Sequence, residues 1–242
     1  MKKIIKIILA VSFVTAVLTG CVMTPQTDAL GNSFVGFGEH QIVTEEEAKK
    51  LPRGERLTRI SIDMQNIGFK KVKVSNLMDS VTESILSIFE NQYELLSRYT
   101  LIVDDHKDVT SFIYANEGKS SEELAEEVRR FDMMAETEDQ KIGPKLQRYR
   151  TANDEIQKQN TILAGELVKQ TVRLASFFQE NSEELLGADA LTMLLNAGKI
   201  SEAYNLAEIR IHMASIANDF IDDEKAVLEI TKKIQGILDE KL

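Results

Sequence analysis

The chain offers few side chains that could do chemistry, and the first of them is its single thiol. Cys21 is the only cysteine among 242 residues and follows the run Leu18-Thr19-Gly20. Positive charge opens the chain at Met1-Lys2-Lys3 and Lys6, and residues 7–17 form an apolar run too short to span a membrane. This order is typical of a secretory signal peptide. Because the chain has no second cysteine, Cys21 cannot form a disulfide within it.

Leu18, Thr19, Gly20 and Cys21 resemble, in order, the lipobox of bacterial lipoprotein precursors: an apolar or branched residue, a small residue, Gly or Ala, then Cys. The resemblance implies that the Cys21 thiol receives a diacylglyceryl group and that the Gly20–Cys21 bond is then cleaved. In many bacteria the new amino group is also acylated, typically with palmitate. Two or three acyl chains hold a protein at a bilayer persistently, whereas one does so only marginally. The alternatives are an N-terminal anchor helix with a chance cysteine, and secretion with a free thiol.

The residue after the lipobox bears on the membrane to which the protein is sorted. In two-membrane bacteria, Asp directly after the lipidated cysteine tends to retain lipoproteins of this family at the inner membrane. Val22 stands at that position. The resemblance therefore implies an outer-membrane protein that faces the periplasm. A one-membrane source would instead place it on the outer face of the cytoplasmic membrane.

The three histidines do not form a metal-binding pattern. His40, His106 and His212 lie far apart, without the spacing of a zinc site. The best candidate for a metal or pH-sensitive site is His106 among its aspartates, which are Asp104, Asp105 and Asp108. A solvated loop between helices explains the same residues, and the run lacks the alternating oxygen ligands of a calcium loop. We expect no catalytic or cofactor-binding residue, and no metal ligand beyond this weak set.

Composition and motifs argue against several classes of function. The 29 Lys+Arg residues face 39 Asp+Glu residues, a net charge of −10, which argues against nucleic-acid binding. Tryptophan is absent, which weakens any prediction of sugar stacking. No nucleotide-binding, serine-hydrolase or zinc-protease motif occurs, so we predict no enzyme. Met133-Met134, with Met193 and Met213, could furnish an adaptable groove, although core filling is the favoured interpretation.

The N-terminal third is predicted to contain a leader, a tether and a mixed segment. Residues 1–20 form the signal peptide, and 21–38 form the lipidated N-terminus and a flexible tether rich in Gly. Residues 39–75 form a lead-in that begins with a helix capped by Thr44 and ended by Pro52. Alternation of Ile60, Ile62 and Met64, with Val72 and Val74 beyond a turn, permits a small β-hairpin near 57–74. The alternative is an irregular lead-in.

Residues 76–242 are predicted to form a bundle of long amphipathic helices, so the fold class is mainly all-α. Apolar residues recur at three- and four-residue steps over 77–102, and the acidic run 104–108 ends or interrupts that helix. Ser120 or Ser121 caps a second helix, with Leu124, Val128 and Phe131 inward. Gly143-Pro144 opens a new helix.

The new helix is predicted to run to Leu186, with one heptad-like seam. The seam residues are Leu146, Tyr149, Asn153, Ile156, Asn160, Leu163, Leu167, Gln170, Leu174 and Phe177. Its polar positions make a poor strict coiled coil, but buried Asn fixes register, so we expect pairing with another helix of the chain. A helix over 188–197 is expected to stop at Gly198, with Ser201 capping the next. The last helix is continuous or kinked near Asp222-Asp223.

Three functions are consistent with these features. The first is a non-enzymatic lipoprotein that serves as a scaffold, assembly factor or accessory subunit of an envelope complex. Its expected partners are the membrane, through the lipid on Cys21, and envelope proteins. The second is a carrier of an apolar or lipid-like ligand between helices. The third is an enzyme with an unfamiliar site near His106. The oligomeric state is left open.

Overall fold

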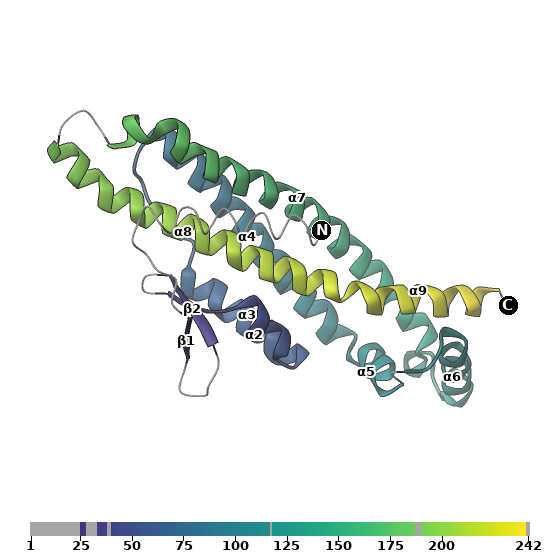
Figure 1. The fold of residues 1–242 in the computed structure, drawn as a ribbon. Helices are drawn as coiled ribbons and strands as arrows, with labels where there is room; N and C mark the ends of the chain where they lie inside the picture. The colour runs from purple at the N-terminus through teal and green to yellow at the C-terminus, as the bar shows by residue number, and fades with distance from the viewer. Residues whose placement is uncertain (1–24, 28–32, 38–39, 117, 187–189, 241–242) are drawn as a thin grey trace. The chain divides into compact units, whose positions relative to one another are not determined.

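The fold is almost entirely helical, which confirms the predicted class. The computed structural model describes residues 25–27, 33–37, 40–116, 118–186 and 190–240. Three strands come first (Figure 1): β1 (Pro25–Thr27), β2 (Ser33–Phe37) and β3 (His40–Val43). Helices α2 (Glu45–Lys50), α3 (Arg53–Ile67), α4 (Asn76–Asp105), α5 (Lys107–Ala115) and α6 (Ser121–Met134) follow. The short 3-10 helix η1 (Glu138–Gln140) then precedes α7 (Gly143–Leu186), α8 (Ala190–Asp223) and α9 (Lys225–Asp239). Within these described ranges, no helix is both long enough and apolar enough to cross a membrane.

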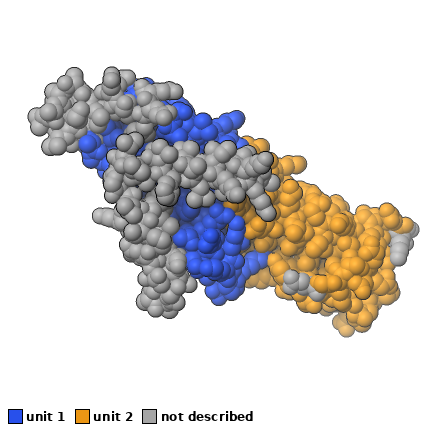
Figure 2. All heavy atoms as spheres, viewed as in Figure 1, with its two compact units in different colours: residues 1–93, 163–217 blue, residues 94–162, 218–242 orange. Residues whose placement is uncertain are grey.

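The chain divides into two compact units, shown in different colours in Figure 2. Unit 1 comprises residues 1–93 and 163–217, and unit 2 comprises residues 94–162 and 218–242. Helices α4, α7 and α8 contribute residues to both units.

A small antiparallel sheet lies in unit 1, N-terminal to the helices. Its strand order is β1-β2-β3, with Pro25 opposite Val35 and Phe34 opposite Val43. Strands β1 and β2 fall within 21–38, so the prediction of a flexible tether is wrong for those residues. The remainder of that predicted tether lies outside the described residues. The backbone N–H of Val43 donates to the Asp63 carboxylate at 2.9 Å, which joins β3 to helix α3.

The β-hairpin considered near 57–74 is not present. Residues 53–67 are helix α3, and residues 68–75 contain no strand. The alternation of Ile60, Ile62 and Met64 was misleading, because Ile60 and Met64 are fully buried while Ile62 is 46% exposed. Leu57 and Ile67 complete a buried stripe at three- and four-residue steps, which only a helix can present on one face.

Local capping and helix-breaking signals operate where the sequence predicts them. The Thr44 hydroxyl accepts a hydrogen bond from the Glu47 N–H and caps α2. Ser120 caps α6 in a complete capping box with Glu123. The acidic run ends α4 at Asp105, and α5 begins at Lys107. These breaks depend on neighbouring residues, which is why the sequence reveals them.

A carboxylate of α6 fixes the start of α7. Asp132 accepts hydrogen bonds from the N–H groups of Ile142 and Gly143, at 2.6 and 3.1 Å. A Cβ atom on residue 143 would lie 2.6 Å from the Asp132 Oδ2, so the close approach requires glycine here. Negative charge beside these first N–H groups of α7 is also favoured by the helix dipole.

The predicted seam of α7 is confirmed. Nine of its ten residues are buried and Gln170 is partly buried. The helix bends at Asn181, which has non-helical backbone angles. Asn160 Nδ2 donates to the Asn218 carbonyl at 3.0 Å, and Asn218 Nδ2 donates back to the Asn160 carbonyl at 2.8 Å. The predicted pairing of a buried Asn with another helix of the same chain is therefore present within unit 2.

Helix α8 is longer than the sequence predicts. It runs unbroken from Ala190 to Asp223, so the predicted stop at Gly198 and cap at Ser201 are wrong. An interior glycine costs about 1 kcal/mol relative to alanine, which packed neighbours can offset. Ile200, Ala203 and Ala207 are all buried just after that glycine. Of the two alternatives left open near Asp222-Asp223, the structure has the break, since α8 ends at Asp223 and α9 begins at Lys225.

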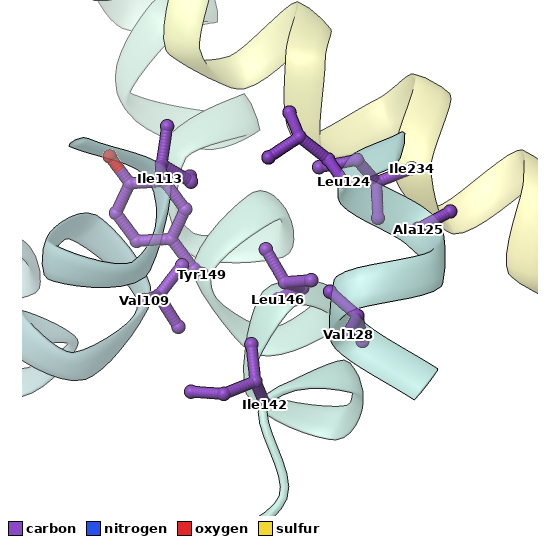
Figure 3. Close-up of a cluster of buried hydrophobic side chains, with 9 residues drawn as sticks. All are labelled: Val109, Ile113, Leu124, Ala125, Val128, Ile142, Leu146, Tyr149 and Ile234. Atoms are coloured by element: carbon purple, nitrogen blue, oxygen red, sulfur yellow. The ribbon is translucent and has the colours of Figure 1, made fainter. Parts of the chain in front are cut away.

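The core of unit 2 contains side chains from four helices and from the residue just before α7 (Figure 3). Val109 and Ile113 come from α5, and α6 contributes Leu124, Ala125 and Val128. The start of α7, with Ile142 before it, and Ile234 of α9 complete the cluster. This packing positions helix α6, whose inward face is covered as far as Val128.

The paired amides yield a prediction on stability. Asn160→Ala removes one of the two reciprocal bonds and leaves a buried carbonyl without its amide partner. We expect a loss of about 1–3 kcal/mol in the free energy of unfolding, measured by urea denaturation. Thr161→Ala on the same helix, at an exposed position, is the matched control and should change stability by at most about 0.5 kcal/mol. Equal losses in both variants would show that the amide pair is not a register-fixing contact.

Candidate functional site

The predicted lipidation site lies outside the described residues. Gly20 and Cys21 both fall within residues 1–24, which are not among the residues that the structure describes. The predicted chemistry of Cys21 therefore stays a prediction from its sequence pattern. The remaining candidates can be compared with the geometry.

The structure does not bring His106 and its aspartates together as a ligand set. The His106 ring packs edge-on against Tyr149, with the ring centroids 5.8 Å apart. Asp104 forms an ion pair with Lys107 at 3.2 Å, and Asp108 pairs with Lys145 of α7. Within the described ranges, no group of three or more His, Cys, Asp or Glu side chains is placed to hold a metal ion. Asp105 adds no further ligand to such a group.

Asp108 has a structural role between α5 and α7. Its partial burial acts to raise the pKa of the carboxyl, but the hydrogen bond from Lys145 and the N–H of Val109 outweigh this and lower the pKa below its ordinary value. The carboxylate therefore stays ionised and keeps its lysine partner at neutral pH. The ion pair with Lys145, rather than ligand binding, accounts for the carboxylate of Asp108 beside His106.

A polar groove of about 860 Å³ lies in unit 1 between helices α4 and α7. Its lining includes Lys73 before α4, Asp79, Ser80 and Glu83 on α4, and Glu166, Lys169 and Gln170 on α7. Lys73 Nζ lies 2.7 Å from Glu83 Oε1 and 3.7 Å from Asp79 Oδ2. The hydrogen bond from Lys73 lowers the pKa of Glu83. Lys71 Nζ also lies 3.6 Å from Glu83 Oε1, so two lysines balance the two carboxylates on this side of the groove.

The groove does not present an activated nucleophile. The Ser84 hydroxyl donates to the Ser80 carbonyl at 2.8 Å, and Arg173 donates to the Ser80 hydroxyl at 3.3 Å. A serine nucleophile needs a base within hydrogen-bond reach, and these two serines have other partners. The groove can bind a polar molecule through its amides and hydroxyls, but its geometry does not indicate a reaction.

Two buried charged residues that the sequence did not single out hold unit 1 together. Arg210 of α8, which is 3% exposed, donates to the carbonyls of Gly68 and Lys70 at 3.0 and 2.7 Å. Its guanidinium lies 6.0 Å from the Phe89 ring centroid. Gly68 ends α3 with a φ of 71°, a conformation that glycine adopts without strain. Arg210 therefore fixes the turn between α3 and α4.

Asp63 performs a similar task at β3. Burial raises the pKa of its carboxyl, while the Val43 N–H and the Arg59 side chain oppose that shift by hydrogen bonding. Arg59 lies one helical turn away on α3 and supplies the compensating positive charge. Both buried charges thus satisfy backbone groups.

Helix α6 ends in exposed apolar side chains. Phe131 is 43% exposed, Met133 is 78% exposed and Met134 is 69% exposed. The favoured interpretation of Met133 and Met134 as core filler is therefore wrong, and so is the inward assignment of Phe131. Met213 is fully buried and does fill the core, while the side chain of Met193 lies outside the described residues. We refer to Phe131, Met133 and Met134 as the α6 tip.

Comparisons with protein-family models, with curated proteins and with solved structures gave no match to this chain. Its function must therefore be argued from its own residues. The sequence indicated an adaptable groove at Met133-Met134 only as the alternative to core filling, because the apolar spacing of α6 continues to its end and spacing alone does not reveal where the covering helices stop. Two adjacent methionines at a helix end were the available signal.

A buried imidazole yields a prediction on pH. Burial lowers the pKa of His212 below 6.5, opposed by the charge of Glu45. As the pH falls, His212 therefore takes up a proton at a higher pH in the unfolded chain than in the folded chain. The free energy of unfolding should consequently fall as the pH drops below 6.5. The slope from one proton is at most about 1.4 kcal/mol per pH unit.

The measurement is urea denaturation between pH 7.5 and 5.0. His212→Gln should make the free energy of unfolding fall less steeply as the pH drops. His106→Gln, the matched control, should leave the contribution of His212 to that fall in place. Comparing slopes removes the effect of any constant loss of stability in either variant. An unchanged slope in His212→Gln would refute the assignment.

Proposed function

We propose that the protein is a lipid-anchored lipoprotein of the cell envelope that acts without catalysis, as a scaffold, assembly factor or accessory subunit. The observation that carries the proposal is the run Leu18-Thr19-Gly20-Cys21 behind a basic and apolar leader. Anchoring at the outer membrane, facing the periplasm, is the favoured placement. The outer face of the cytoplasmic membrane is the alternative for a one-membrane source.

The character of the described helices supports a binding role over a reaction. Asp108 forms an ion pair, and Asp63 and Arg210 hold backbone groups, so these charged side chains have structural roles. The α6 tip, in contrast, leaves large apolar side chains exposed, and exposed apolar surface often marks a site of association. The polar lining of the groove in unit 1 does not favour the alternative of an apolar ligand.

The lipid anchor can be tested by changing the single thiol. In cells that carry the lipoprotein-processing pathway, the wild-type chain should gain the mass of its acyl groups, lose residues 1–20 and fractionate with membranes. Cys21→Ser should abolish both the acyl mass and the cleavage before residue 21, because no other thiol can accept the lipid. Intact-protein mass spectrometry and membrane fractionation measure these outcomes.

Val22→Ala is the matched control, since it changes the next residue without removing the thiol. It should retain both the acyl mass and the cleavage. Detection of unmodified Cys21 in the mature wild-type chain would overturn the anchor. A wild-type chain that stays a solitary monomer after crosslinking in intact cells would count against the scaffold role.

A further inference from the structure

The α6 tip is apolar surface that the described part of unit 2 leaves uncovered. Helix α6 buries Leu124, Ala125 and Val128 in the core of unit 2 (Figure 3). Phe131 follows Val128 by three residues, near the same side of the helix, yet it is 43% exposed. Its ring stands edge-on to Phe112, with centroids 6.4 Å apart. Met133 and Met134 extend the apolar surface to the last residue of the helix.

The tip is held by polar contacts on both sides. Arg129, two residues before Phe131, donates to the Ile237 carbonyl of α9 at 3.1 Å. Asp132, between Phe131 and Met133, accepts the backbone N–H groups at the start of α7. Ordering of this backbone before any partner arrives lowers the entropic cost of binding. The methionine side chains remain adaptable, which suits a surface that must fit a partner helix.

The charge around the tip limits what can cover it. Acidic residues outnumber basic ones by eight to four between residues 118 and 141, and by six to three when Lys119, Glu122 and Glu123 at the opposite end of α6 are left out. The four basic residues already have acidic partners: Lys119 and Arg130 pair with Glu127, Arg129 with Glu126, and Lys141 with Glu138. Glu136 and Asp139, just beyond the tip, are exposed. The surplus of charge around the apolar tip is therefore negative.

The helix dipole adds to this negative field. The tip occupies the last turn of α6, where the carbonyl end carries partial negative charge, and that turn contains no basic residue. A second copy of the chain would bring an equally acidic surface against this one. An anionic membrane surface would be repelled as well. A partner that places Lys or Arg around an apolar stripe is attracted both by the surplus acidic side chains and by the carbonyl end of α6.

We propose that the α6 tip is the docking site for a basic amphipathic helix of a protein partner. The apolar stripe of that helix covers Phe131, Met133 and Met134, and its flanking cations approach Glu136, Asp139 and the end of α6. This is the recognition mode in which an amphipathic helix lays its apolar face on a hydrophobic surface. The assignment rests on the proposed scaffold function, although it does not require the lipid anchor.

Binding of defined peptides tests the chemistry of the tip. The probes are two fluorescent amphipathic helices with the same leucine stripe, one flanked by lysine and the other by glutamate. Fluorescence anisotropy with the detergent-solubilised full chain should show the lysine probe binding about tenfold or more tightly than the glutamate probe. Met133→Gln combined with Met134→Gln should weaken the lysine probe by about tenfold or more while leaving every charge in place.

Ile162→Gln is the matched control, since it removes an apolar side chain that is 61% exposed on a different helix. Its affinity for the lysine probe should equal that of the wild type. Both methionines are largely exposed, so the double variant should fold, and circular dichroism checks this directly. Equal binding of the two probes, or equal binding to the double variant and the control, overturns the proposal.

Crosslinking in intact cells distinguishes the source of the partner. A photoreactive residue at position 133 should yield a crosslink to another protein, and the crosslinked peptide should be basic and amphipathic. The same residue at position 162 should not yield it. A crosslink to a second copy, an adduct with lipid alone, or no adduct would each overturn the proposal. A wild-type chain that carries no acyl mass but still binds the lysine probe would show that the anchor has failed and the tip has not, whereas an acylated chain that does not bind the lysine probe would show the reverse.

Discussion

Burial of polar amides along an otherwise apolar seam is the constraint on which the helical packing depends. Asn160 and Asn218 each donate to the backbone carbonyl of the other residue. A shift of either helix by one residue would separate both pairs and leave buried amide groups unsatisfied, at a cost of about 1–3 kcal/mol each. Apolar contacts alone tolerate such shifts far better, because dispersion and hydrophobic burial are not directional. The amides therefore select one register among many that bury similar area.

Much of this arrangement could be predicted from the sequence because its causes are local or periodic. The seam of α7 repeats at heptad-like steps, and its polar members can be identified by position even before their partners are known. The cap at Ser120 and the break at His106 each depend on residues within one helical turn, and Gly143-Pro144 marks the start of α7 locally, although Asp132 of α6 also holds that start. Such signals act on the chain before distant segments meet, so they survive in the final fold.

The errors arise where distant contacts decide the outcome. Residues 57–64 alternate well enough for a strand, but Leu57, Ile60, Met64 and Ile67 also recur at helical steps, and tertiary burial of that stripe, with Ile62 left at the surface, selects helix α3. Arg210 reaches the Gly68 carbonyl across 142 positions, a link that no local pattern contains. Gly198 lies inside α8 because packing after it offsets the weak helix propensity of glycine. Core filling was wrongly favoured over an exposed groove at Met133-Met134 for the same reason, since exposure depends on where neighbouring helices end.

A lipid anchor would compensate for the small size of the α6 tip. Three side chains cannot cover the area of about 1,000 Å² that a stable interface between freely diffusing proteins needs. A lipid on Cys21 would confine the protein to the same surface as its partners and raise their effective concentration, so that a weak contact is occupied. Long-range attraction by the acidic surroundings of the tip would then favour basic partners over other apolar surfaces in the envelope. The anchor would thus bring the protein and its partners together, and the acidic surroundings of the tip would favour basic partners. The methionine side chains would then adapt to the apolar surface of the partner.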